Sequence, residues 1–357
     1  MLRRLRDRSH RGILTPMDAA AERDLPTLWR SGSWRAEAHT WIRAQADVTG
    51  PIQEHLVRFW SVVLKVPVAG GWAWFKENAP SQSFEAALME EVARVAPDRV
   101  PPLLGVERAR GWLLTADLGD PIGEHRPADD REAAAEVAEV AGAWSEVQRR
   151  LSGREPAMRA ARVPAFEDSN AISYAVALAD HLARLPEGDG RRLDLEGRRQ
   201  VEAGLGRLGE DAARLEASGI PESVEHNDLH LWNAMRGRDG GIAFIDLGDA
   251  VWSHPFASVR PLLWVMRTRL PFPPGAPEYE RVIDAYLESW TDLAPAHELR
   301  RLLPAAERMS ALHRAEYWRR LMADVPLEAI DVEFLDAPAH WLLAATAENP
   351  FAWSQAH

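Results

Sequence analysis

Three oxygen-bearing side chains follow apolar runs in the stretches 224–235, VEHNDLHLWNAM, and 242–250, IAFIDLGDA. Asp228 and Asn233 lie five residues apart, and Asp246 follows thirteen residues later. The intervening RGRDGG is typical of a tight hairpin turn, so the flanking strands should pair and bring the three side chains together. Carboxylate and amide oxygens are the hard ligands that Mg²⁺ prefers.

This arrangement fits the transfer of a phosphoryl group from ATP. That reaction needs a carboxylate that orients the attacking hydroxyl, oxygen ligands that hold Mg²⁺ on the phosphates, and a cation that binds the phosphates from the other side. In kinases the catalytic Asp and a metal-binding Asn follow the pattern D-x-x-x-x-N, and a second Asp precedes a Gly on the next strand. We therefore expect Asp228 to orient or deprotonate the acceptor, and Asn233 and Asp246 to hold Mg²⁺.

Other side chains near these three leave alternatives open. His226 lies two residues before Asp228, and we expect it to hold the loop by a hydrogen bond. His230 is either a loop residue or a ligand, and Asp249 either supports the metal through a hydrogen bond or is a turn residue. A zinc or iron hydrolase that uses the H-x-D-x-H cluster and Asp246 is an alternative reading, but it leaves the β-rich region of the chain without a purpose.

The motif HNDLHLWN, followed by IDLGD, resembles the aminoglycoside phosphotransferase and choline kinase superfamily. That superfamily has the protein-kinase-like fold and typically reads H-G-D-[LI]-H-x-x-N and then I-D-[WF]-[GE]. Here Asn227 occupies the position of the usual Gly, and Leu247 that of the usual aromatic residue. Asn tolerates unusual backbone angles better than most residues, and neither difference touches the reacting groups. The resemblance spans about residues 50–260.

The resemblance implies a strand lysine that contacts the α- and β-phosphates, and a helix glutamate that pairs with it. Lys76 in WAWFKEN fits the first role, and Glu85 fits the second, with Glu90 or Glu91 as alternatives. The chain has only two lysines among its 42 Lys and Arg residues. Lys76 therefore stands where a compact ammonium suits better than a planar guanidinium, whereas Lys65 is consistent with chance retention.

The resemblance also implies contacts for the rest of the nucleotide. No G-x-G-x-x-G precedes the strand lysine, so a loop that contains Ser61 is expected to cover the phosphates with its N–H groups and hydroxyl. The backbone from Thr115 to Leu118, in WLLTADLGD, is expected to bind adenine, which places Asp117 at the nucleotide as well. ATP and Mg²⁺ are the expected cofactors.

Hydrophobic patterns predict the elements that position these residues. Residues 33–46 predict a helix, 55–78 a β-hairpin with Lys76 on the same face as two tryptophans, 81–96 an amphipathic helix, and 100–120 two short strands. Later helices are predicted at 129–151, 168–186, 191–217, 277–293, 296–323 and 337–346. Together with the resemblance, this predicts an α+β, protein-kinase-like two-lobe fold, with an N-terminal arm and packing helix at 1–49, a β-rich N-lobe at 50–117 and a mainly helical C-lobe at 118–357.

Composition narrows the remaining possibilities. The chain of 357 residues is 46% hydrophobic and has no Cys, which excludes disulfides, cysteine-ligated metal sites and a cysteine nucleophile. The net charge of −12 argues against a nucleic-acid partner. The chain shows no secretory signal and no apolar run of about 18 residues, so we expect a soluble cytoplasmic protein in which residues 1–24 form a mobile arm.

We therefore predict an ATP- and Mg²⁺-dependent kinase that phosphorylates a hydroxyl of a small molecule, which would be aminoglycoside-like, an amino sugar, a sugar or an amino alcohol. A cationic acceptor would need acidic residues, for which the candidates are Glu225, Asp284, Glu288 and Glu316. The candidates for stacking or cation–π contacts are Trp232, Trp252, Trp264, Trp290 and Trp318. A catalytically silent nucleotide-binding module is an alternative. A protein kinase is disfavoured because the glycine-rich loop and an A-P-E segment are lacking.

Overall fold

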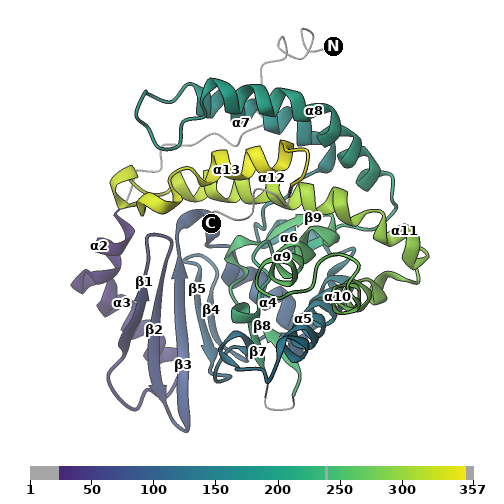
Figure 1. The fold of residues 1–357 in the computed structure, drawn as a ribbon. Coiled ribbons are helices and arrows are strands. Elements are labelled where there is room, and N and C mark those ends of the chain that lie inside the picture. The colour runs from purple at the N-terminus through teal and green to yellow at the C-terminus, as the bar shows by residue number, and fades with distance from the viewer. Residues whose placement is uncertain (1–23, 238–239, 351–357) are drawn as a thin grey trace.

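The computed structural model describes residues 24–237 and 240–350. Figure 1 shows a β-sheet region formed by the N-terminal part of the chain, beside a larger, mainly helical region formed by the rest. This arrangement confirms the predicted α+β architecture of two lobes. Apart from Asp24, the predicted N-terminal arm lies outside the described residues.

The N-lobe contains a five-stranded antiparallel sheet with the strand order β1-β2-β3-β5-β4. The strands are β1 Gln53–Val57, β2 Ser61–Val68, β3 Gly71–Asn78, β4 Leu103–Glu107 and β5 Trp112–Ala116, and helix α4, Glu85–Val95, connects β3 to β4. β-branched and aromatic residues dominate β2 and β3, as expected for a pleated and half-buried surface. Gly70 and Gly71 adopt positive φ angles at the turn that joins these two strands.

Two predicted boundaries in this lobe are wrong in detail. The β-rich stretch that begins at residue 55 is interrupted, because the N–H of Arg58 donates to the carbonyl of Ser61 at 2.9 Å and reverses the chain there. The helix predicted at 81–96 begins at Glu85, because a 3₁₀ turn at Pro80–Gln82 precedes it. The first change creates a tight turn between β1 and β2, where a continuous strand was expected.

The two faces of the sheet have different partners. Ala73 and Phe75 of β3 are buried against helices α2, Leu25–Arg30, and α3, Gly32–Gln45. Side chains alternate along a strand, so Trp74 and Lys76 occupy the opposite face, as the alternation predicts. Lys76 is thereby turned toward the C-lobe.

The C-lobe is mainly helical, and its small strands pair beside the helices. Within the described residues its helices are α5 Asp130–Leu151, α6 Glu155–Ala160, α7 Ala171–Ala183, α8 Leu195–Glu216, α9 Arg260–Thr268, α10 Pro277–Leu287, α11 Ala296–Arg300, α12 Leu303–Met322 and α13 Ala337–Thr346. Its strands form two antiparallel pairs, β6 Ser223–Glu225 with β9 Val251–Ser253 and β7 Ala234–Arg236 with β8 Ile242–Phe244. The six predicted helices occur, but the one at 296–323 is divided into α11 and α12, and α6 and α9 were not predicted. No helix in the described ranges is both long and apolar enough to cross a membrane.

Apolar contacts join the two lobes. Trp318 and Leu321 of α12, together with Ile330, belong to the same buried cluster as Val66 and Phe75 of the sheet. Burial of this apolar surface couples the C-terminal part of the chain to the N-lobe. The lobe boundary after residue 117 stays a prediction.

Helices α8 and α13 approach each other at Gly204. A Cβ atom there would lie 2.0 Å from the carbonyl oxygen of Thr346, whereas a Cβ on Gly206 of the same helix would meet nothing within 4 Å. We expect Gly204→Ala to lower the free energy of unfolding by about 1–3 kcal/mol through overpacking. Gly206→Ala is the matched control and should raise it by about 0.5–1 kcal/mol through helix propensity. Urea unfolding curves measure both changes, and equal effects would contradict the close approach of the helices.

Candidate active site

The loop that carries Asp228 follows strand β6 and is held by an unusual backbone. Asn227 adopts φ 63°, a left-handed conformation that most side chains avoid. Its side-chain amide donates to the carbonyl of Asp249 at 3.2 Å. The prediction that Asn tolerates this position is therefore confirmed. The hydrogen bond also links this loop to the segment that contains Asp246 and Asp249.

The β7–β8 hairpin places Asn233 next to Asp246. Ala234 pairs with Phe244, and the ladder continues with the N–H of Ile245, which donates to the carbonyl of Asn233 at 3.1 Å. The predicted pairing of these strands is thus confirmed. Asp246 adopts φ 61°, which lies in the left-handed region. This backbone conformation costs a non-glycine residue of order 1–3 kcal/mol, so the surrounding structure holds the Asp246 backbone against that strain.

Lys76 lies between two carboxylates from different elements. Its Nζ atom is 2.8 Å from Oε2 of Glu85 on α4 and 2.5 Å from Oδ1 of Asp246. Burial alone would lower the pKa of Lys76, but the charges of Asp246 and Glu85 outweigh it and raise the pKa above its ordinary value. The ammonium is therefore charged at neutral pH and links the sheet to the C-lobe.

Glu85 is the helix glutamate that reaches this cluster. It is 3% exposed, its Oε1 accepts from the N–H of Leu247 at 2.9 Å, and Asn78 donates to its Oε2. Glu90 instead pairs with an arginine at 2.6 Å, and Glu91 pairs with the same arginine, Arg108, at 3.2 Å. Among the three candidates in the sequence, the structure brings only Glu85 to Lys76.

Arg314 and His230 lie beside the carboxylate of Asp228. Its Oδ1 lies 3.7 Å from Nη1 of Arg314, and its Oδ2 lies 3.4 Å from Nε2 of His230. The side-chain nitrogen of Asn233 donates to the Asp228 carbonyl at 3.0 Å. Burial raises the pKa of Asp228, but the charge of Arg314 and the hydrogen bond from His230 outweigh it, so the pKa lies well below its ordinary value. Asp228 is charged at neutral pH.

Arg314 on α12 is a site residue that sequence reasoning missed. It pairs with Asp249 at 2.6 Å and donates to the carbonyl of Asn227 at 3.2 Å, so it binds both ends of the catalytic segment. The carboxylate of Asp249 therefore pairs with Arg314 and also accepts a hydrogen bond from the side chain of Gln82 at 3.0 Å. No sequence motif predicts that Arg314 belongs to the site, because it lies in a long helix far along the chain from these partners.

His226 does not make the predicted hydrogen bond. Within the described residues neither ring nitrogen has a partner, and the ring packs edge-on against Trp144 at 5.1 Å between ring centroids. Burial lowers its pKa to about 4, so it is neutral. The loop is held here by the His226 N–H, which donates to Oγ of Ser258 at 3.0 Å.

Asn233 and Asp246 have the donor atoms that Mg²⁺ requires. The nitrogen of the Asn233 amide is engaged by the Asp228 carbonyl, which leaves Oδ1 for a metal, and the Asp246 side chain is 47% exposed. Mg²⁺ on a nucleotide usually takes one or two protein oxygens beside phosphates and water, so this donor set fits. Among the described residues, no group of three or more His, Asp or Glu side chains is placed to hold a metal ion.

The expected nucleotide contacts lie on the Lys76 face of the sheet. Ser61 pairs with Asn78, and Thr115 pairs with Trp74, so these residues share the face that carries Lys76. Both Ser61 and Thr115 are buried. Their contact with a nucleotide stays a prediction.

Asp117 is already engaged within the N-lobe. Its carboxylate accepts from Nε1 of Trp74 at 2.6 Å, and its N–H donates to the carbonyl of Trp72 at 3.2 Å. The N–H of Ala116 likewise donates to Pro102 at 2.9 Å. Of the backbone expected to bind adenine, Thr115 and Ala116 lie in the strand ladder, so the N–H of Leu118 is the candidate donor that these bonds leave available.

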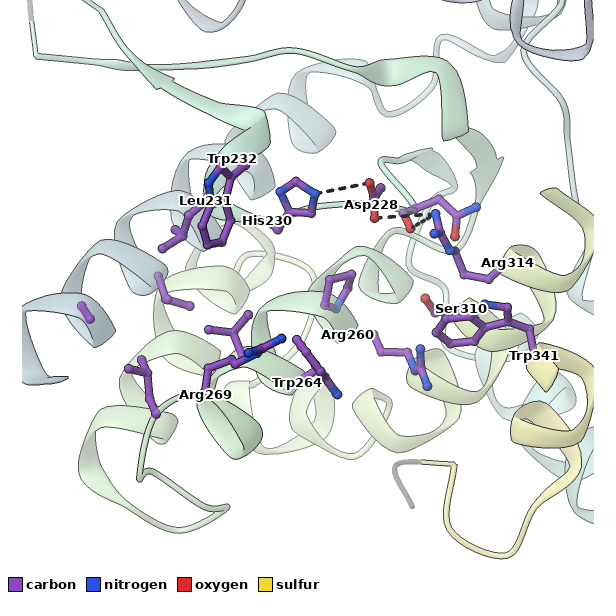
Figure 2. Close-up of a pocket in the computed structure, with 16 residues that line it drawn as sticks. Asp228, His230, Leu231, Trp232, Arg260, Trp264, Arg269, Ser310, Arg314 and Trp341 are labelled. Atoms are coloured by element: carbon purple, nitrogen blue, oxygen red, sulfur yellow. Dashed lines mark hydrogen bonds and ion pairs between the residues drawn. The ribbon is translucent and has the colours of Figure 1, made fainter. Parts of the chain in front are cut away.

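A cavity of about 590 Å³ lies beside Asp228, within the size range of small-molecule sites. Figure 2 shows its 16 lining residues, which come from the catalytic loop and from helices α5, α9, α12 and α13. Of the five tryptophans predicted for substrate contact, Trp232 and Trp264 line it, whereas Trp252, Trp290 and Trp318 are buried in the core. Trp341 of α13 also lines it and was not predicted.

The four acidic residues proposed for a cationic acceptor do not line this cavity. Glu225 is buried against His313, and Glu316 pairs with Arg319 at 2.6 Å. Asp284 pairs with an arginine on the neighbouring helix α11, and Glu288 lies at the end of α10. These four candidates therefore do not form an acidic pocket beside Asp228.

Comparison with solved structures finds the same fold in several kinases. A choline/ethanolamine kinase family protein from Mesorhizobium loti matches with a TM-score of 0.56 and 17% identity, over 89% of this chain and 97% of its own. An ethanolamine kinase from Plasmodium vivax matches with a TM-score of 0.58 and 13% identity, over 85% of this chain and 83% of its own. The ADP-bound aminoglycoside phosphotransferase APH(2'')-Ib matches with a TM-score of 0.53 and 15% identity, over 88% of this chain and 99% of its own.

Sequence comparisons add the family. A search of curated proteins finds no match to this chain. Residues 56–299, more than half of the chain, match the phosphotransferase enzyme family. This region contains Lys76, Glu85, Asp228, Asn233 and Asp246. The chain therefore belongs to the phosphotransferase enzyme family and has the protein-kinase-like fold of its small-molecule kinases.

Proposed function

We propose that this protein transfers the γ-phosphoryl group of ATP to a hydroxyl of a small molecule, with Mg²⁺ bound to the nucleotide. The observation that carries this proposal is the cluster of Lys76, Glu85 and Asp246, which joins the sheet to the loop that contains Asp228. A half-buried cation and a more exposed carboxylate side by side suit a site that must bind phosphates and a divalent cation together.

Asp228 would receive the hydrogen bond of the acceptor hydroxyl and fix its direction of attack. The acceptor oxygen forms a bond to the γ-phosphorus while the bond from that phosphorus to the bridging oxygen breaks. ADP leaves, and the hydroxyl proton passes to the Asp228 carboxylate. The low pKa of Asp228 makes it a weak base, so orientation is its main contribution and proton transfer comes late, as in a loose transition state.

The remaining residues would bind the nucleotide. Asn233 and Asp246 would hold Mg²⁺, which neutralises charge that develops on the phosphates. Lys76 now contacts Asp246 directly, and we expect it to exchange part of that contact for phosphate oxygens when the nucleotide binds. Ser61 and the backbone near Asp117 would complete the nucleotide site. We propose that the protein acts in the cytoplasm.

Release of ADP in the presence of Mg²⁺ tests this function. The acceptor panel contains aminoglycosides, amino sugars, neutral sugars, choline and hydroxy acids, and each reaction is run with the native chain and with Asp228→Asn. Turnover with one acceptor class, lost in the variant, supports the kinase. ATP binding without ADP release from any acceptor favours the catalytically silent module instead.

A further inference from the structure

The cavity beside Asp228 is poor in acidic groups. Among its lining residues, Asp228 is the only carboxylate, whereas three are arginines: Arg260, Arg269 and Arg314. Arg314 is already paired with Asp249 at 2.6 Å and with Asp228 at 3.7 Å. The other two arginines have no carboxylate within 4.0 Å in the part of the chain that the structure describes. The charged side chains that a ligand would meet in this cavity are therefore mainly positive, although the net charge of the whole chain is negative.

Arg260 is buried without a counter-charge. It is 4% exposed, its Nε has no hydrogen-bond partner among the described residues, and one terminal nitrogen donates to the carbonyl of Pro350 at 3.3 Å. The nearby carboxylate of Glu307 is taken by Arg267 at 3.0 Å. A buried cation with an unsatisfied donor is costly unless something pairs with it.

Aromatic and aliphatic side chains form the rest of the wall. Arg269 lies over the ring of Trp264 at 5.5 Å, and Arg260 lies over the ring of Trp341 at 4.6 Å. In the view of Figure 2, Trp264 lies between these two arginines, and Asp228 and His230 lie on the other side of the cavity. The cavity therefore offers flat apolar surfaces flanked by guanidinium groups, opposite the carboxylate that would receive a hydroxyl.

We propose that the acceptor is an anionic hydroxyl compound with an apolar or planar body, whose carboxylate or phosphate is bound by Arg260 and Arg269. This inference rests on the proposed function, since it assumes that Asp228 receives the acceptor hydroxyl. Guanidinium groups bind carboxylate and phosphate oxygens in bidentate geometry, and such charge-assisted hydrogen bonds are among the stronger ones. A cationic acceptor would instead face uncompensated arginines and find no acidic partner except Asp228.

Three matched aryl glycosides test the charge of the acceptor. They are the 4-nitrophenyl β-D-glucuronide, glucoside and glucosaminide, which share the sugar ring and the aryl group and are anionic, neutral and cationic, respectively. A fourth compound, 4-nitrophenyl glucoside 6-phosphate, distinguishes binding of a phosphate from binding of a carboxylate. Binding to the native chain is measured by calorimetry without ATP. We expect an anionic member to bind about tenfold or more tighter than the glucoside, from one charge-assisted hydrogen bond. Equal or tighter binding of the neutral or cationic member, or no binding by any, would overturn the proposal.

Variants connect this preference to the arginines. Arg269→Gln, at an exposed position, should reduce the ratio of anion affinity to glucoside affinity about tenfold. Arg281→Gln removes an exposed arginine outside the cavity and should leave this ratio unchanged. A preference that survives in Arg269→Gln and in Arg260→Met would overturn the assignment. Failure of phosphoryl transfer is seen separately, as absent ADP release while the anion preference persists.

Discussion

Asp228→Asn should lower kcat by about a thousandfold while the affinity for ATP stays close to that of the native chain. The amide keeps the shape of the carboxylate but can neither accept the hydroxyl proton nor carry the negative charge that Arg314 and His230 now surround. Proton-transfer and orienting groups contribute typically about 10²- to 10⁴-fold, which sets the size of the effect. Steady-state ADP release gives kcat, and calorimetry gives the affinity for ATP.

Asp249→Asn is the matched control for this change. Asp249 also pairs with Arg314, but the cavity beside Asp228 does not include it. We expect this variant to lower the free energy of unfolding by about 1–3 kcal/mol, because it leaves the partly buried guanidinium of Arg314 with a weaker partner, and to lower kcat less than Asp228→Asn. If both variants reduced kcat equally, the effect would come from displacement of Arg314, and Asp228 would have no separate chemical role.

The site residues that could be predicted are those that lie within one local pattern. Asp228, Asn233 and Asp246 belong to two short motifs joined by one hairpin, so their spacing in the sequence nearly fixes their proximity. Lys76 followed from the resemblance, and alternation along its strand predicted the face that it occupies. The proximity of the first three residues follows from local contacts, whereas the contact of Lys76 with Asp246 joins positions 170 residues apart.

The residues that could not be predicted depend on contacts between distant elements. Arg314 meets Asp249 across 65 positions of the chain, and no local period records that pairing. The same holds for Arg260 and Trp341, which come from different helices and line one cavity. The acidic candidates failed for a related reason, since Asp284 is engaged by Arg300 on the next helix, a pairing that charge counting cannot foresee.

Lys76→Met should reduce kcat/KM for ATP by about 10²- to 10³-fold, the loss that follows when a preorganised donor to developing charge is removed. Methionine keeps the apolar stem but removes the ammonium that contacts Glu85 and Asp246. Glu85 is then buried with the Leu247 N–H and Asn78 as partners, so the free energy of unfolding should also fall, by about 1–3 kcal/mol.

The stability loss could by itself reduce activity, so two further variants separate the causes. Lys65→Met removes the other lysine, which lies over the ring of Trp72 at 4.3 Å on the same face of the sheet, and we expect kcat/KM within about threefold of the native value. Lys76→Met combined with Glu85→Gln removes the unpaired buried charge and should recover stability without recovering activity. Recovery of turnover in the double variant would mean that Lys76 only holds Glu85 in place. Continued loss would mean that its ammonium acts at Asp246 or on the phosphates, because neither Met nor Gln restores these interactions.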